Sequence, residues 1–165
     1  MCLVDKELLN KISLFLKKQK LSVATAESCT GGLIAHNLTN ISGSSDYFDR
    51  GIVSYSNNAK IELFGITDNL LNEHGAVSEP VAKAMAEGVK NKSKVDIGIA
   101  TTGIAGPTGG TKDKPVGLVY IAISSSDGTE VKKFQFSGDR LQNKENTCNA
   151  AFTMLFDYLT KKHKQ

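Results

Sequence analysis

The chain has 165 residues, 40% of them hydrophobic and 22% charged, which is the composition of a globular protein, and we expect residues 1–165 to form one domain. Its 20 basic and 17 acidic residues leave a net charge of +3, and 7% of the residues are aromatic, with no tryptophan. This composition excludes a disordered chain and argues against direct nucleic-acid binding, which uses basic stripes interleaved with aromatic side chains.

The first half of the chain alternates between helix and strand patterns. Apolar residues recur every three or four positions over residues 5–18, which predicts an amphipathic helix. Residues 21–26 predict a short strand, and a glycine pair followed by LIAHNL predicts a turn into a second helix. The β-rich residues 47–55 predict another strand, and residues 57–64 favour a helix that carries Lys60 in its first turns.

The second half begins with another helix pattern. In GAVSEPVAKAMAEGVK, we expect Ser78 to be the N-cap, with Glu79 and Pro80 in the first turn. The buried face of this helix should hold the apolar residues Val81, Ala82, Met85 and Val89. Residues 95–102 then predict a buried strand, and the following GIAGPTGGTKDKPVG is too rich in glycine and proline for regular structure.

Two strands and a helix complete the predicted fold. Residues 117–125 and 129–136 flank Asp127-Gly128, a two-residue signal for an antiparallel hairpin, and apolar spacing predicts a last helix over residues 139–161. The elements together predict an α/β fold with three α/β/α layers, whose mixed, mostly parallel sheet has an antiparallel edge hairpin. Ligands of such sheets bind beyond the carboxyl ends of the strands, where TAESCTGG and TTGIAGPTGG should frame one pocket.

The cysteines and the N-terminus indicate the compartment. Cys2, Cys29 and Cys148 form no CxxC pair and leave one cysteine over, which argues against a disulfide framework and a structural zinc site. Charged residues near the N-terminus interrupt any signal-peptide core, and no apolar run approaches the ~18 residues that cross a bilayer. We therefore expect a cytoplasmic protein with no membrane partner.

Ser28 is a candidate nucleophile at the turn between a strand and a helix. Thr30, Gly31 and Gly32 follow it, and glycines at a helix N-terminus allow backbone N–H groups to converge on an oxyanion. The same pattern is also typical of a helix cap or a phosphate-binding turn. The residues of the turn alone leave these alternatives open.

A serine nucleophile requires a base, and Lys60 is the candidate. The histidines His36, His74 and His163 have no recognisable motif around them. A lysine amine can act near neutral pH when burial lowers its pKa, and in VSYSNNAK both Tyr55 and Lys60 could reach one pocket edge. The alternative is that Lys60 is a solvated surface lysine, and sequence periodicity does not decide between the two.

Three other features could carry chemistry. Cys29 is a rival nucleophile, because a helix N-terminus lowers a thiol pKa. The loop Gly103–Gly110 could approach a ligand closely, and Arg140 could grip a phosphate, although either can be structural. The loop lacks both the P-loop ending and the GxGxxG spacing, which disfavours an ATPase.

Five blocks, which span nearly the whole chain in order, closely resemble the CinA C-terminal domain family, a family that includes nicotinamide mononucleotide amidases. The blocks are TAESCTGGLIA, GSSDYFDRGIVSYSNNAK, GAVSEPVAKAMAEG, TTGIAGPTGGTKDKPVGLVYIA and FSGDR. The resemblance implies hydrolysis of a linear amide C–N bond, in which nicotinamide mononucleotide yields nicotinic acid mononucleotide and ammonia during pyridine-nucleotide recycling. It also implies a stand-alone form, without the larger N-terminal domain of many CinA proteins.

The resemblance also implies roles for individual residues. It places the nucleophile at Ser28, the base at Lys60 and an assisting hydroxyl at Tyr55, and it requires no metal or cofactor. Expected substrate-binding residues are Thr30, Gly31, Gly32, Thr102, Gly103, Gly106 and Arg140. The expected partner is a small nucleotide substrate, and a homo-oligomer is an assembly that small α/β enzymes often form. The alternative hypothesis is a non-catalytic nucleotide-binding or accessory module linked to competence or DNA damage.

Overall fold

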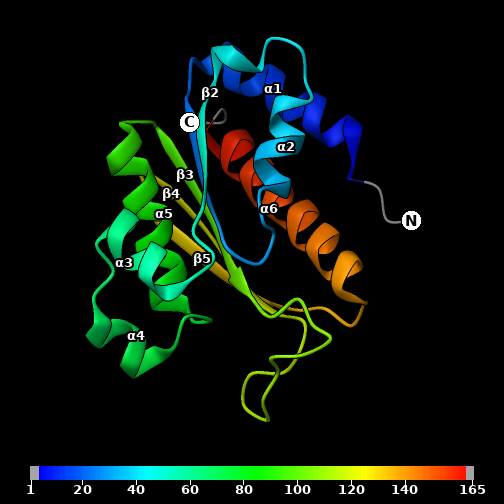
Figure 1. Ribbon diagram of the computed structural model, residues 1–165. Helices are drawn as coiled ribbons and strands as arrows, with labels where there is room; N and C mark the ends of the chain where they lie inside the picture. Colours follow the sequence, from blue (N-terminus) through cyan, green and yellow to red (C-terminus); the bar gives the residue numbers. More distant parts are fainter. Residues whose placement is uncertain (1–3, 163–165) are drawn as a thin grey trace.

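A mixed β-sheet with helices on both faces forms the body of the protein, whose structure, a computed structural model, describes residues 4–162 (Figure 1). Within that range the sheet order is β2-β1-β3-β4-β5. The strands are β1 Val23–Glu27, β2 Phe48–Val53, β3 Ile97–Gly103, β4 Leu118–Ser125 and β5 Gly128–Gln135. β1 runs parallel to β2 and β3, whereas β4 is antiparallel to both β3 and β5. All described strands except β4 therefore point the same way, which confirms the predicted fold class and the hairpin.

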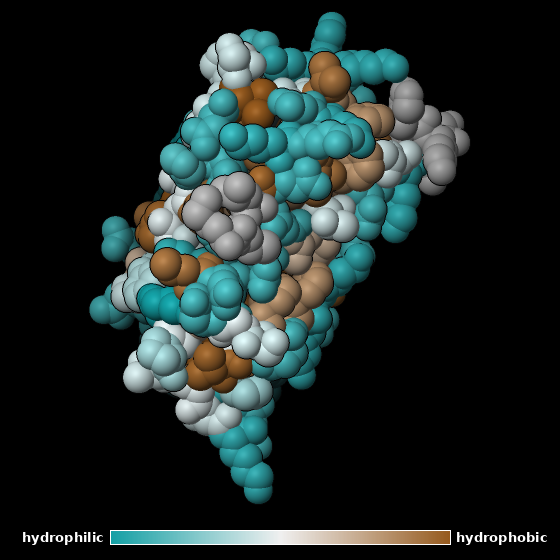
Figure 2. Space-filling view, turned by 90° about the vertical axis from the view of Figure 1, so that its right-hand side faces the viewer, coloured by the Kyte–Doolittle hydropathy of each residue, from teal (hydrophilic) through white to brown (hydrophobic). Residues whose placement is uncertain are grey.

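The helices divide between the two faces of this sheet. They are α1 Lys6–Gln19, α2 Leu33–Thr39, α3 Asn57–Phe64, α4 Asp68–His74, α5 Glu79–Ser93 and α6 Arg140–Lys162, with a 3-10 turn η1 at Ser44–Asp46. One core cluster packs α1, α2 and α6 on one face, and a second packs α3, α4 and α5 on the other (Figure 1). The outer surface on the side seen in Figure 2 is mainly hydrophilic, with separate apolar areas.

Side-chain size differs between the two faces of the central strands. In β3, Ile97 and Ile99 face the first cluster, whereas Ala100 faces α5 in the second. Gly98 also allows α5 to approach, because a Cβ there would overlap the carbonyl oxygen of Ala86. Small residues thus let α5 lie close against the sheet, and its predicted apolar face is completely buried.

The helices agree with the predictions except in two respects, the role of Ser78 and the presence of α4. Ser78 stands at the N-cap position of α5, but its hydroxyl donates to the Gly75 carbonyl at 2.8 Å and does not cap the helix. Helix α4 was not predicted. Its seven residues are too few to show a periodicity, and it is stabilised by a cap at Thr67, whose hydroxyl accepts from the Leu70 N–H at 3.2 Å.

The glycine-rich segment after β3 is a loop, as predicted, and contacts with other elements hold it. Lys114 Nζ donates to the His74 carbonyl at the end of α4 (2.6 Å), and Asn143 Nδ2 donates to the Ala105 carbonyl (3.0 Å). None of the helices within residues 4–162 is long and apolar enough to cross a membrane. Two residues named in the sequence analysis, Cys2 and His163, lie outside the described residues.

Candidate active site

The carboxyl ends of β1, β2 and β3 meet at one edge of the sheet, and Ser28 lies there. Its N–H donates to the Thr101 carbonyl at 3.0 Å, and the Ser54 N–H donates to the Glu27 carbonyl at 2.9 Å. These bonds extend the parallel ladder past the end of β1. A pocket of about 200 Å³ opens at this point, lined by Ser28, Cys29, Tyr55, Ala76, Val77, Thr102, Gly103 and Ala105. The two motifs thus frame one pocket, as the sequence predicted.

Lys60 reaches this pocket from the first turn of α3. Ser56 caps that helix by accepting from the Ala59 N–H at 3.1 Å, which sets the direction of the first turn. The Lys60 residue is 1% exposed, and its Nζ lies 3.2 Å from Ser28 Oγ. Nζ also donates to the carbonyl oxygens of Ser54 (2.8 Å) and Tyr55 (3.2 Å). Lys60 is therefore not a solvated surface lysine.

The surroundings of Lys60 shift its protonation equilibrium toward the neutral amine. Burial lowers the pKa of the Lys60 amine, because the low-dielectric interior disfavours the ammonium ion, and the nearby Cys29 acts weakly in the opposite direction. A neutral amine keeps two hydrogens, which match the carbonyl oxygens of Ser54 and Tyr55. Its lone pair can then face Ser28 Oγ and accept the serine proton.

Tyr55 lines the pocket, but its hydroxyl has a different partner from the one expected. The residue is 61% exposed, and its hydroxyl accepts from Arg140 Nη2 at 3.0 Å. Within residues 4–162 this hydroxyl forms no hydrogen bond to Ser28 or Lys60. The backbone carbonyl of Tyr55, and not its phenol, is what contacts the lysine.

The turn after Ser28 is held by contacts inside the chain. The Gly31 N–H donates to the Ser28 carbonyl (3.1 Å), and the Gly32 N–H donates to Glu27 Oε2 (3.0 Å). The Thr30 hydroxyl also donates to Glu27 Oε2, at 2.6 Å. The expectation that Gly31 and Gly32 hold an oxyanion is therefore wrong, because a carboxylate and a carbonyl of the chain already occupy their N–H groups.

Other backbone groups remain available for an oxyanion. Within the described part of the chain, the N–H groups of Cys29 and Thr30 donate to no backbone carbonyl. The N–H of the residue after a nucleophile is a common oxyanion donor. Cys29 itself is buried, and burial, as the main cause, raises the pKa of its thiol to about 12. A thiol with this pKa stays protonated at neutral pH, which argues against Cys29 as the nucleophile.

The loop residues expected to bind substrate have structural contacts. The Thr102 hydroxyl donates to the Ala76 carbonyl at 2.7 Å, and a Cβ on Gly103 would lie 2.8 Å from the Leu118 carbonyl oxygen. Gly103 is therefore required for packing against β4. Gly106 has a positive φ of 87° and offers its carbonyl to Arg140.

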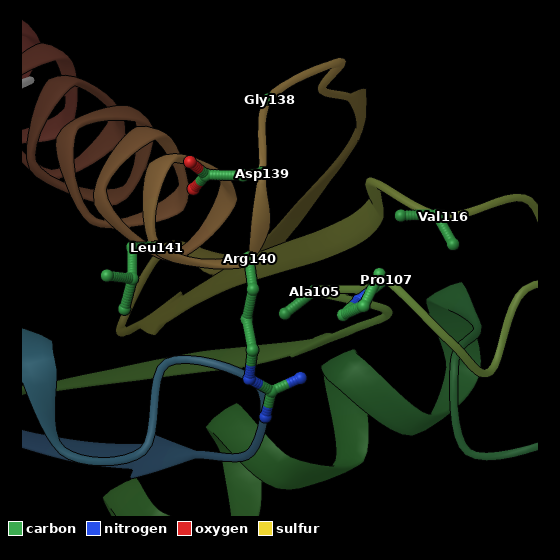
Figure 3. A pocket seen from close by; sticks show the side chains of 7 residues that line it. All are labelled: Ala105, Pro107, Val116, Gly138, Asp139, Arg140 and Leu141. Carbon is green, nitrogen blue, oxygen red and sulfur yellow. The ribbon is translucent and has the colours of Figure 1, made fainter.

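Arg140, the first residue of α6, lies between two pockets. Its Nη1 donates to the Gly106 carbonyl at 2.7 Å, while its Nη2 contacts Tyr55 at the Ser28 pocket. Figure 3 shows its side chain extending between Leu141 on one side and Ala105 and Pro107 on the other. The second pocket, of about 450 Å³, is lined by Ala105, Pro107, Val116, Gly138, Asp139, Arg140 and Leu141.

Two residues near the turn escaped the sequence analysis. Lys144 lies one helical turn after Arg140, and its Nζ is 3.6 Å from the point where a Cβ of Gly31 would stand. It forms no ion pair or hydrogen bond within residues 4–162. Nothing in the sequence distinguishes Lys144 from the other lysines of this amphipathic helix, so its position near Gly31 could not be predicted. Glu27 ends the buried strand β1, and an acidic residue at the end of an apolar strand was the one sequence signal that could have identified it.

The remaining candidates lie elsewhere. His36 lies on α2 and His74 ends α4, and neither lines the Ser28 pocket. No group of three or more His, Cys, Asp or Glu side chains within residues 4–162 could hold a metal ion.

Comparisons with known proteins give the following matches. The family model described as the CinA C-terminal domain matches residues 5–159. The chain is 52% identical to a CinA-like protein of Syntrophus aciditrophicus over 94% of its own length, but spans only 37% of that protein. A solved CinA superfamily protein of Klebsiella pneumoniae matches with a TM-score of 0.91 and 31% identity, covering 94% of this chain and 97% of the other. The competence/damage inducible protein CihA of Agrobacterium tumefaciens matches with a TM-score of 0.89 and 38% identity, covering 97% and 99%.

Proposed function

The chain belongs to the CinA C-terminal domain family, and from this membership we propose that it is an amide hydrolase that converts nicotinamide mononucleotide to nicotinic acid mononucleotide and ammonia. The observation that carries the proposal is the buried amine of Lys60, 3.2 Å from Ser28 Oγ at the wall of a pocket. A nucleophile in contact with a base of lowered pKa is the arrangement required for covalent acyl transfer.

The reaction follows from these positions. Neutral Lys60 takes the proton of Ser28, whose Oγ attacks the carboxamide carbon and moves the π electrons to the oxygen. The N–H groups of Cys29 and Thr30 are the available donors to this oxyanion. Collapse breaks the C–N bond, and the Lys60 ammonium returns the proton to the departing ammonia. Water, deprotonated by Lys60, then hydrolyses the acyl-enzyme and regenerates Ser28.

Two cations on successive turns of α6 support an anionic substrate. Arg140 contacts Tyr55 at one edge of the Ser28 pocket, and Lys144 lies near Gly31 at the turn. Residues four apart project from the same side of a helix. A phosphate attached to the reacting amide through a ribose would lie toward this basic edge.

The test compares ammonia release from nicotinamide, its riboside, its mononucleotide and its dinucleotide. The mononucleotide should be the preferred substrate, Ser28→Ala should lose turnover, and the neighbouring Cys29→Ala should retain it. Normal turnover by Ser28→Ala would refute the serine mechanism. Tight calorimetric binding of the mononucleotide without ammonia release would instead favour the non-catalytic, competence- or damage-linked module, which the name of the Agrobacterium protein suggests.

A further inference from the structure

The Glu27 side chain is completely enclosed and accepts hydrogen bonds from five donors. The residue is 1% exposed and immediately precedes Ser28. Two of the donors are hydroxyls and three are backbone N–H groups of the turn and of α2: Thr25 Oγ1 (3.2 Å), Thr30 Oγ1 (2.6 Å), Gly32 N (3.0 Å), Ile34 N (3.1 Å) and Ala35 N (2.8 Å). Every partner donates, so the side chain acts only as an acceptor, as an ionised carboxylate does.

This carboxylate occupies the place where an external anion would bind. Unpaired N–H groups at a helix N-terminus attract anions, and α2 would otherwise present those of Gly32, Ile34 and Ala35. Glu27 satisfies all three from within the chain, and it joins the end of β1 to the start of α2. The N-terminus of α2 is therefore closed to the substrate's phosphate.

The nucleophile stands between the two ends that Glu27 joins. We infer that the Glu27 carboxylate is the positioning residue for the proposed nucleophile: it fixes the Ser28–Gly32 turn so that Ser28 Oγ stays against Lys60 Nζ. This inference rests on the proposed function. Neither Ser28 nor Lys60 is among the hydrogen-bond partners of the carboxylate, so Glu27 acts through the backbone of the turn.

Glu27→Gln tests this role because the isosteric amide cannot replace the carboxylate. Oε1 accepts from Thr25 and Ala35, and Oε2 accepts from Thr30, Gly32 and Ile34. In either orientation the amide NH₂ faces donors. We expect kcat to fall about 100-fold with KM unchanged, because a small misplacement of a reacting atom costs rate more than binding. Glu27→Asp keeps the charge but has a shorter side chain, so its kcat should lie between those of Glu27→Gln and the wild-type protein.

A control separates positioning from general stability. Leu159→Ala opens a cavity in the core near the end of α6 and should lower stability without lowering kcat at a temperature where both variants stay folded. If Glu27→Gln does not fold, Thr30→Val removes one donor and should give a smaller fall in kcat. A folded Glu27→Gln with wild-type kcat, or an equal fall in Leu159→Ala, overturns the inference.

Amide hydrogen exchange provides a readout that does not depend on turnover. Glu27→Gln should reduce the protection of the Gly32, Ile34 and Ala35 amides, while those of the β4–β5 hairpin keep theirs. If the wild-type protein releases no ammonia, the proposed function fails. Loss of protection at these amides would then still support the carboxylate's control of the turn, and unchanged protection would overturn it.

Discussion

The burial of one amine explains most of the chemistry proposed for individual residues. Lys60 is enclosed, and the loss of hydration lowers the pKa of its amine, while two carbonyl oxygens accept its hydrogens. Most lysines are exposed, and their position along a helix does not reveal which one is buried. The residues alone could therefore name Lys60 only as one alternative, although the family resemblance pointed to it, and the fold supplies its contact with Ser28.

The rate should rise with pH as Lys60 loses its proton, because only the neutral amine accepts the Ser28 proton. Since burial lowers the pKa of Lys60, the rise in kcat should have its midpoint below ~10.4, the ordinary value of lysine. Where unfolded Lys60 still binds the proton that the folded form has lost, the free energy of unfolding also rises with pH. A pH profile of kcat measures the midpoint. Lys60→Arg, which cannot deprotonate, should be inactive throughout, and an active Lys60→Arg would exclude the lysine as base.

Lys144 should contribute to affinity for a phosphate and not to the chemical step. Lys144→Gln removes a cation near Gly31 and should raise KM for nicotinamide mononucleotide several-fold, about 1 kcal/mol or less in binding, with kcat retained. The phosphate-free riboside should show no change in KM. The exposed Lys133→Gln on β5 serves as the control. Equal effects on both substrates would place the phosphate elsewhere.

At the scale of elements, long periodic segments were predictable and short or externally stabilised ones were not. The spacing of apolar residues placed α1, α5 and α6, and the Asp127-Gly128 signal placed the hairpin. Helix α4 depends on its cap and on packing against α5, which no local pattern records. The Ser28 turn was located correctly, but its N–H groups were misassigned because their acceptor, Glu27, became visible only in the fold.

The close approach of α5 to β3 should make Gly98 intolerant of any side chain. In Gly98→Ala the added methyl meets the Ala86 carbonyl and the Lys90 Cβ, so helix and sheet must separate. We expect a loss of about 3 kcal/mol in the free energy of unfolding, measured with urea. The exposed Lys133→Ala on the same sheet should change it little. A loss no larger than that of Lys133→Ala would show that α5 can shift without cost.

At the scale of the whole molecule, three chain segments far apart in sequence form the candidate site. Ser28 follows β1, Lys60 and Tyr55 follow β2, and Arg140 begins α6 after the hairpin. The prediction that ligands bind beyond the carboxyl ends of the strands located the pocket from sequence. The contacts of Arg140 with Tyr55 and Gly106 could not be predicted, because they depend on how the start of α6 packs against segments much earlier in the chain.

The carbonyl groups that receive the Lys60 hydrogens follow β2, which is an edge strand with β1 as its one neighbour in the described sheet. Edge strands open more readily than central ones, so fraying here needs far less free energy than unfolding the sheet. Such an opening would return the amine to water and restore its ordinary basicity. The resulting molecule would keep its core and its central strands, yet hold a charged lysine and an inert serine. Heat inactivation of this protein would then report local opening of the edge strand β2 and not unfolding of the central strands.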